Sequence, residues 1–168
     1  MKKIYFILFI FFSTISTAHN ESSERLKAVF IYNFIRYIDF PDLKTSDNLI
    51  IGVKDSPDLL QELLLISKIK KSQGSHAIIV KDFKENDEDL NILYIGKNHL
   101  KDIEGYVSMA HKKHVLIITD IEHGVKKGAA IELIINENKA EFDISKHNIK
   151  DCKLNVYREL LDLARNIE

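Results

Sequence analysis

Residues 114–120 read HVLIITD, an unbroken run of apolar, mostly β-branched side chains that ends at Thr119-Asp120. A strand with one wet face alternates apolar and polar residues, whereas a strand buried on both faces reads as a continuous apolar run. Three further segments have this character: NLIIGV at 48–53, HAIIVKDF at 76–83 and NILYIG at 91–96. The four runs together predict a largely parallel sheet.

The segments between these strands carry helical signals. Ser23 to Ile38 repeats apolar residues at helical spacing, and Pro41 disfavours helical geometry at Phe40, so this helix is predicted to end by Asp39. Pro57 opens a second helix that is predicted to reach Ser67, and a third is predicted over 98–111. Helices that alternate with buried strands cover both faces of a parallel sheet.

The C-terminal third has a different pattern. AAIELIINENKAEFDIS, residues 129–145, alternates on either side of Asn136-Glu137-Asn138, which predicts an antiparallel hairpin. Residues 148–167 carry an apolar stripe that includes Leu154 and Leu160, which predicts one long amphipathic helix. The predicted fold is therefore a single α/β domain: a mostly parallel central sheet covered by helices on both faces, with a C-terminal antiparallel hairpin and a long closing helix.

The first 18 residues resemble a secretory signal peptide. Two lysines precede the apolar run Ile4–Phe12, and small residues lead to Ala18. The run is shorter than the roughly 20 apolar residues of a membrane-spanning helix, although an uncleaved N-terminal anchor is the alternative. We expect cleavage near Ala18, which leaves residues 19–168 as one exported domain.

Charge and cysteine content exclude several classes of protein. The formal net charge is −1, and acidic and basic residues are interspersed, so we expect binding neither to nucleic acid nor to an anionic lipid surface. The one cysteine, Cys152, has no intramolecular partner. It is either buried and reduced or paired with another chain, and burial is the favoured interpretation.

Motifs for catalysis, metals and cofactors are weak. His111 and His114 lack a third ligand at a recognisable spacing, and GVKKG at 124–128 leads into a strand and lacks the Gly-Lys-Ser/Thr ending of a phosphate loop. Cys152 has no evident His partner, and Asp87 and Asp89 lie in a polar loop. We expect a non-enzymatic protein without catalytic residues, metal or cofactor, and read GVKKG as a loop with two flexible points.

The first helix is unusually aromatic. KAVFIYNFIRYIDFP, residues 27–41, covers more than the roughly 100° apolar face of a surface helix. One interpretation is a deeply buried helix in which Asn33 is hydrogen-bonded. The other is that one aromatic side meets a protein partner, for which we single out Phe30, Phe34 and Tyr37. Both interpretations can hold for one helix.

The same stretch resembles the opening of the YfiR-like periplasmic proteins: Lys-Ala, an aromatic, Tyr-Asn-Phe and an aromatic-Pro ending. LIIGVKDSP, NILYIG and VLIITD resemble the strands that follow in that family, and Gly128-Ala-Ala-Ile, AEFDIS and ELLDLA resemble its closing region. The resemblance covers nearly the whole exported chain in the family's order. It does not extend to the cysteines that form disulfides in many relatives, because here one of those regions reads Asp89-Leu90-Asn91.

The resemblance implies a periplasmic signalling regulator. Family members bind the periplasmic part of an inner-membrane diguanylate cyclase and hold it inactive, which lowers cyclic di-GMP and disfavours biofilm. It also implies an outer-membrane lipoprotein as a second partner and a homodimer, while a sensor kinase is an alternative membrane partner. A periplasmic small-molecule-binding module is the alternative function, because doubly wound sheets offer a crevice at the carboxyl ends of their strands.

Overall fold

The computed structural model describes residues 17–44, 47–69, 76–84, 89–97, 103–136 and 139–168. The predicted signal peptide lies almost entirely outside them. The α-helices are α1 (Thr17–Ile35), α2 (Pro57–Ile69), α3 (Ile103–Lys113), α4 (Lys146–Asp151) and α5 (Arg158–Leu161). The strands are β1 (Ile38–Asp39), β2 (Leu49–Lys54), β3 (Ile78–Asp82), β4 (Ile92–Ile95), β5 (Leu116–Thr119), β6 (Ile131–Asn136), β7 (Lys139–Ile144), β8 (Asn155–Val156) and β9 (Asn166–Ile167).

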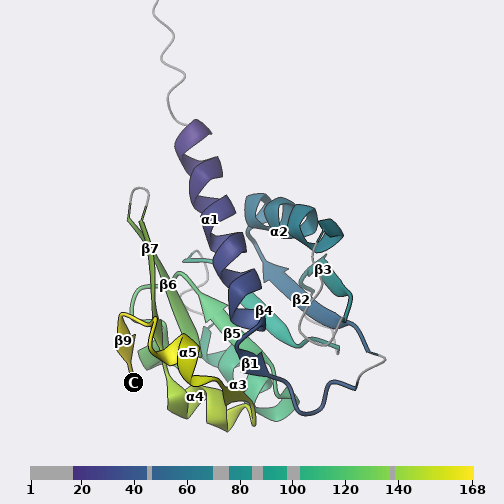
Figure 1. The fold of residues 1–168 in the computed structure, drawn as a ribbon, viewed down its shortest axis with the longest axis vertical. Coiled ribbons are helices and arrows are strands. Elements are labelled where there is room, and N and C mark those ends of the chain that lie inside the picture. The colour runs from purple at the N-terminus through teal and green to yellow at the C-terminus, as the bar shows by residue number, and fades with distance from the viewer. Residues whose placement is uncertain (1–16, 45–46, 70–75, 85–88, 98–102, 137–138) are drawn as a thin grey trace, which may run out of the picture.

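The predicted sheet is confirmed. Seven strands lie in the order β3-β2-β4-β5-β6-β7-β9, and the neighbours from β3 to β6 are parallel. β7 is antiparallel to β6, as predicted for a hairpin, and β9 adds a short parallel strand at the edge. The chain is a mixed α/β single domain (Figure 1).

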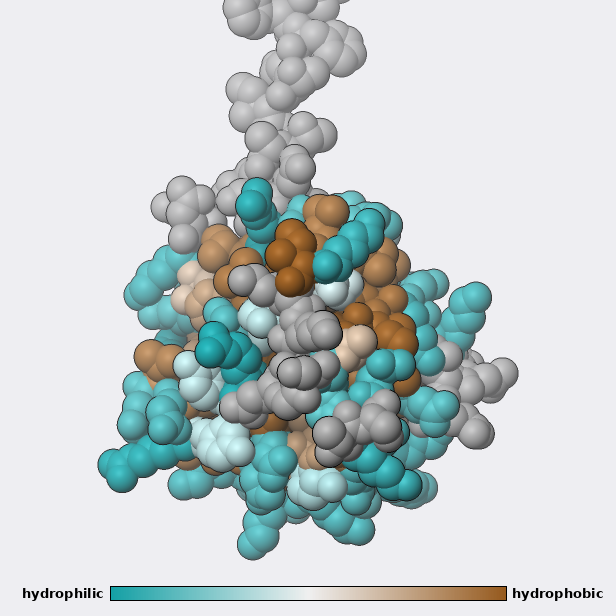
Figure 2. Space-filling view, turned by 45° about the vertical axis from the view of Figure 1, so that its right-hand side comes forward, coloured by the Kyte–Doolittle hydropathy of each residue, from teal (hydrophilic) through white to brown (hydrophobic). Residues whose placement is uncertain are grey.

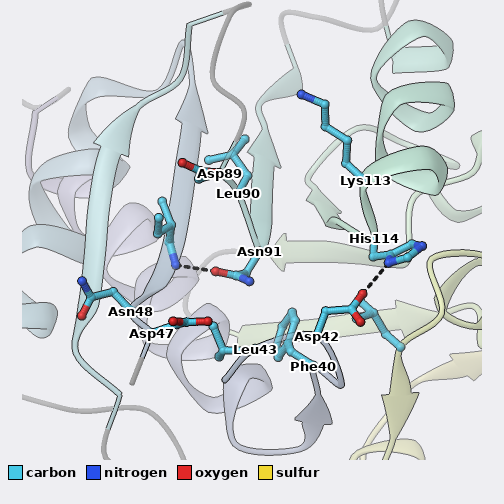
Figure 3. Close-up of a pocket in the computed structure, with 12 residues that line it drawn as sticks. Phe40, Asp42, Leu43, Asp47, Asn48, Asp89, Leu90, Asn91, Lys113 and His114 are labelled. Carbon is cyan, nitrogen blue, oxygen red and sulfur yellow. Dashed lines mark hydrogen bonds and ion pairs between the residues drawn. The ribbon is translucent and has the colours of Figure 1, made fainter. Parts of the chain in front are cut away.

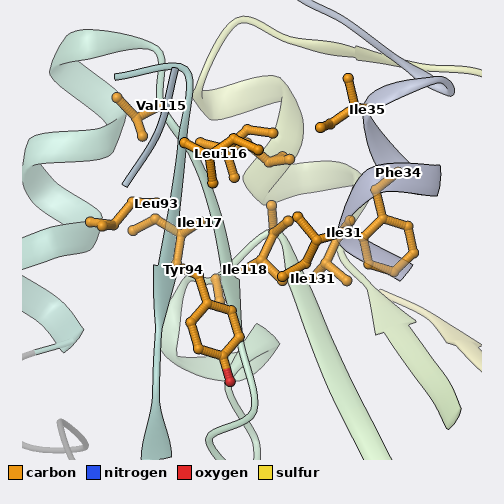
Figure 4. Packing of buried hydrophobic residues seen from close by; sticks show 14 of the residues in the cluster. Ile31, Phe34, Ile35, Leu93, Tyr94, Val115, Leu116, Ile117, Ile118 and Ile131 are labelled. Atoms are coloured by element: carbon orange, nitrogen blue, oxygen red, sulfur yellow. The ribbon is translucent and has the colours of Figure 1, made fainter. Parts of the chain in front are cut away.

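Helices cover both faces of the sheet. The connection through α2 moves from β2 in one direction along the sheet, and the connection through α3 moves from β4 in the other. Because such crossovers are right-handed, α2 and α3 lie on opposite faces. α1 packs beside α2. Figure 4 shows Leu93 and Ile117 on one face, and Tyr94 and Ile118 on the other face with Ile31 of α1.

The first helix ends earlier than predicted. α1 stops at Ile35, and Ile38–Asp39 forms β1, which pairs with β8. The backbone N–H of Tyr157 also donates to the carbonyl of Tyr37 at 2.9 Å. This pairing with a distant segment outweighs the helical pattern of the sequence.

The predicted long closing helix is wrong. Residues 148–167 form the end of α4, followed in order by β8, α5 and β9. Lys153 has a left-handed φ of 56°, which a continuing α-helix does not allow. β8 and β9 each exchange backbone hydrogen bonds with strands far away in the sequence, while Leu154 and Leu160 stay buried. The apolar spacing therefore predicted which side chains are buried but not the backbone conformation.

Two other predictions concern loops and cysteine. In GVKKG, residues 125–127 form a 3₁₀ turn, and a Cβ on Gly124 would lie 2.4 Å from Thr119 Cγ2. Gly128 adopts φ +100°, which other residues rarely adopt.

Cys152 is buried at the end of α4, as favoured, and burial together with the charge of Asp151 raises the pKa of its thiol to about 11. Residues 98–102 of the predicted third helix lie outside the described residues.

Candidate partner-binding groove

A groove of about 370 Å³ lies between α1, β7 and the C-terminal segment that begins at Leu160. We call it the α1–β7 groove. It is lined by Phe30, Asn33, Phe34, Tyr37, Ala140, Glu141, Phe142, Leu160, Leu163 and Arg165. The three aromatic residues singled out from the sequence therefore lie on one wall, and the structure adds a second wall from segments more than 100 residues further along the chain.

Three phenylalanine rings form the floor of the groove. Phe34 stacks edge-to-face on Phe142 with 4.9 Å between ring centroids, and Phe30 lies 6.0 Å from Phe34 and 6.3 Å from Phe142. Such T-shaped pairs add to the free energy gained by burying the rings. Phe34 is 1% exposed, whereas Phe30 is half-buried. Phe30 is therefore more accessible than Phe34 and Phe142.

The opposite rim combines an apolar side chain with an ion pair. Leu163 is 67% exposed beside the groove. Arg165 donates from Nε and Nη2 to the two carboxylate oxygens of Asp143 at 2.8 and 2.6 Å, and Asn166 Nδ2 donates to Asp143 at 3.1 Å. The hydrogen bond from Arg165 is the main reason that the pKa of Asp143 is lowered. These bonds hold β9 against β7 beside the part of the groove that Arg165 lines.

The aromatic helix α1 combines a buried side with residues that line the groove. α1 is deeply buried, but Asn33 is exposed and lines the groove instead of forming a buried hydrogen bond. Sequence reasoning missed Phe142, Leu160 and Leu163, because nothing local brings β7 and α5 beside α1. The one available signal was Leu163, a leucine outside the apolar stripe predicted for the closing helix.

Charged side chains of α1 lie at the carboxyl ends of the strands. The strand order changes direction between β2 and β4, where doubly wound folds bind ligands. There Lys27 of α1 reaches Glu24 Oε1 at 2.7 Å and Asp120 Oδ2 at 2.6 Å, and Ser56 donates to Glu24 at 3.5 Å. Burial and the nearby charges of Asp120 and Glu24 raise the pKa of Tyr94. Lys27 is only 7% exposed, so this ion pair network is buried between α1 and the sheet.

A larger cavity of about 500 Å³ lies at the opposite end of the strands, where β2, β4 and β5 begin (Figure 3). His114 Nδ1 and Asp42 Oδ2 lie 2.6 Å apart across its mouth, and Asn91 accepts a hydrogen bond from the N–H of Ile50 at 2.8 Å. Asp89 and Lys113 add charges to its walls. The cavity is a polar site at the end of the sheet where the sequence reasoning did not expect one.

The described part of the chain contains neither a cluster of metal ligands nor a helix suited to cross a membrane. His114 pairs with Asp42, and within the described ranges no three His, Cys, Asp or Glu side chains gather closely enough to hold a metal ion. In the same part of the chain, no helix combines the length and apolar character needed to cross a bilayer. Figure 2 shows hydrophobic side chains mixed with hydrophilic ones around α1 and α2, where Leu65 and Ile69 of α2 are exposed.

The fold and the groove define a class: an α/β domain with an aromatic groove between its first helix and the C-terminal hairpin. The chain matches the profile of the YfiR/HmsC-like family (DUF4154) over residues 24–165 and belongs to this family. The family comprises periplasmic, non-catalytic regulators in cyclic di-GMP signalling.

A solved structure has a similar fold. It is a conserved domain protein from Vibrio cholerae O1 biovar eltor, with a TM-score of 0.56 and 14% sequence identity. The match covers 86% of this chain and 60% of that one, so this chain spans less than two thirds of the solved protein. No curated protein matches the sequence.

Proposed function

We propose that this protein binds the periplasmic part of an inner-membrane diguanylate cyclase through the α1–β7 groove and restrains its output of cyclic di-GMP. The observation that carries the proposal is the groove itself: Phe30, Phe34 and Tyr37 line it together with the exposed Leu163. Tyr and Phe are enriched where proteins bind one another. Family membership supplies the signalling context.

The proposal also covers the export of the chain, its oligomeric state and a second partner. The chain is exported by a signal peptide cleaved near Ala18, it forms a homodimer, and an outer-membrane lipoprotein competes for it. A protein that acts by binding controls a membrane partner only if it prefers one of the partner's two states. We infer that it prefers the inactive state of the cyclase, and that sequestration by the lipoprotein releases it.

Site-specific photo-cross-linking in living cells tests the location of the partner. A photoreactive phenylalanine replaces Leu163 on the groove or, as a control, Leu65 on α2, which is 54% exposed and does not line the groove. We expect a cross-link to a membrane cyclase from position 163 and none from position 65. A cyclase cross-linked only from position 65 would move the interface to α2.

Charge insertion separates binding from folding. Tyr37→Asp and Leu163→Glu place a charge at the accessible parts of the groove, and we expect at least about a tenfold loss of affinity with an unchanged circular dichroism spectrum. Phe34→Asp buries a charge and is expected to unfold the chain. Loss of folded signal for Tyr37→Asp and Leu163→Glu as well would show that these side chains serve the core alone.

The second candidate function is a small-molecule-binding module. The 500 Å³ cavity at the amino ends of the strands favours it, because charged and apolar groups converge there. A thermal-shift screen of small metabolites tests this function. A compound whose stabilising effect disappears in Lys113→Ala but persists in Leu163→Glu would support it.

A further inference from the structure

The outer edge of β7 is only partly covered. β9 pairs with Asp143 and Ile144 alone, so the first four residues of β7, 139–142, have no neighbouring strand on that side. Figure 1 shows β7 continuing past β9 towards the turn of the hairpin. An uncovered sheet edge presents backbone groups that can pair with another extended chain.

The hydrogen bonds show which backbone groups face outward. Ser145 N–H points towards β6, because it donates to Ala130 O at 2.9 Å. The carbonyls of Phe142 and Ile144 point the other way, because they accept from Arg165 N–H at 2.8 Å and Glu168 N–H at 2.9 Å. Orientation alternates along a strand, so Ala140 also faces outward. Among the described residues, the N–H of Phe142 and both backbone groups of Ala140 have no backbone partner.

Within the described part of the chain, no segment pairs with this stretch of the edge. Before β9, Leu163 N–H donates to Leu160 O and Ala164 N–H donates to Leu161 O, both at 3.2 Å. These donors belong to the turn after α5, so residues 163–164 bend away where an extended chain would continue along β7. This uncovered stretch of β7 borders the α1–β7 groove, because Ala140 and Phe142 also line the groove.

The groove supplies matching side-chain pockets. Phe142 contacts Phe34 of α1, and Ala140 lies two residues away on the same face of β7. An extended segment paired with residues 140–142 would direct alternate side chains towards Phe30 and Leu163. Strand addition works in this way: backbone bonds provide affinity and pockets provide specificity.

We propose that an extended segment of the protein partner adds to the open edge of β7 as an extra strand and inserts an apolar side chain into the α1–β7 groove. This inference rests on the proposed function and specifies how that partner binds. Lys139 and Glu141 form an ion pair at 2.6 Å beside the edge. The open stretch of β7 is only four residues long, so edge-to-edge pairing of two copies would bury far less area than a stable dimer needs, and the occupant is a different protein.

Proline at position 140 gives the sharpest test. Ala140→Pro removes an outward N–H that takes no part in the β6–β7 ladder, so an edge strand tolerates it. Ala140→Val enlarges the same side chain and keeps the N–H. The probe is a linear 12-residue peptide selected from a random phage-displayed library on the protein purified from the cell envelope. We expect Ala140→Pro to bind the peptide about tenfold or more weakly than Ala140→Val does, because only proline removes the backbone N–H.

Equal binding by wild type and Ala140→Pro, or a library that yields no binder, would overturn strand addition. If Ala140→Pro fails to fold, hydrogen exchange on the wild type decides. The amides of Ala140 and Phe142 exchange fast in the free protein and slow down with peptide if a strand adds there; unchanged exchange overturns the proposal. A dimer in size-exclusion chromatography that Ala140→Pro dissociates would also overturn it, because the occupant would be a second copy.

Failure of this inference is distinguishable from failure of the proposed function. The periplasmic domain of the cross-linked cyclase is tested against the same variants. If Leu163→Glu abolishes its binding while Ala140→Pro does not, the groove binds the cyclase without strand addition. If neither variant affects binding, the groove is not the cyclase site, and the peptide result alone decides whether the edge accepts a strand.

Discussion

At the scale of single residues, the ion pair network around Lys27 anchors α1 to the sheet. Two carboxylates, Glu24 and Asp120, face one ammonium group in a site that is largely shielded from water. Burial alone would lower the pKa of Lys27, but the charges and hydrogen bonds of Asp120 and Glu24 outweigh it and raise the pKa. Lys27 is therefore charged at neutral pH and neutralises part of the acidic charge beneath the helix.

Replacing Lys27 should destabilise the fold strongly. Lys27→Met keeps the volume but leaves Glu24 and Asp120 buried without a counter-charge, which costs about 3–5 kcal/mol. Urea unfolding measures the loss, and the triple variant that adds Glu24→Gln and Asp120→Asn should recover part of it. A loss below about 1 kcal/mol for Lys27→Met would contradict a buried network.

The ion pair between Asp143 and Arg165 should make stability depend on pH. The folded-state pKa of Asp143 lies below its ordinary value of 3.8, so the pair stabilises the protein above that value and stops doing so as the pH falls through the folded pKa. The thermal unfolding midpoint of wild type should exceed that of Arg165→Gln near pH 6, and the gap should close below about pH 3.8. Arg158→Gln, which removes an equal charge from an exposed pair, is the control. A gap that stays constant with pH would refute the linkage.

At the scale of secondary structure, buried strands were predictable and the C-terminal region was not. The continuous apolar runs predicted β2, β4 and β5 because burial on both faces is a local sequence property. The same kind of run predicted β3, although this edge strand has one exposed face, at Ile79. The alternation around residues 136–138 predicted β6 and β7. The closing segment depends on β8 pairing with β1 and β9 pairing with β7, and such distant partners leave no local signal. For the same reason the α1 wall of the groove was singled out from the sequence, whereas the wall formed by β7 and the C-terminal segment was not.

The break after α4 gives a prediction at this scale. Lys153 adopts a left-handed conformation that is unfavourable for residues other than glycine, so Lys153→Gly should raise the free energy of unfolding by about 0.5–1 kcal/mol. Lys150→Gly, inside α4, should lower it by about 1 kcal/mol. Denaturant unfolding of both variants provides the measurement. A decrease for Lys153→Gly would indicate that the chain continues there as a helix.

At the scale of the whole molecule, the α1–β7 groove lies beside the open stretch of β7. The buried ion pairs of Lys27 tie α1 to the carboxyl ends of the strands, and the groove lies on the flank where α1 meets β7. Under the proposed function, the exposed rim of this groove receives the protein partner. Differential binding to two states of that partner is then sufficient for control.

The amount of cyclic di-GMP in cells tests this account most directly. It is measured by mass spectrometry in a strain that lacks the protein and is complemented with wild type, Leu163→Glu or the control Leu65→Glu at equal envelope levels. The account predicts low cyclic di-GMP with wild type and Leu65→Glu, and the high level of the deletion strain with Leu163→Glu. Repression by Leu163→Glu equal to that by wild type would contradict the claim that the α1–β7 groove binds and restrains the cyclase.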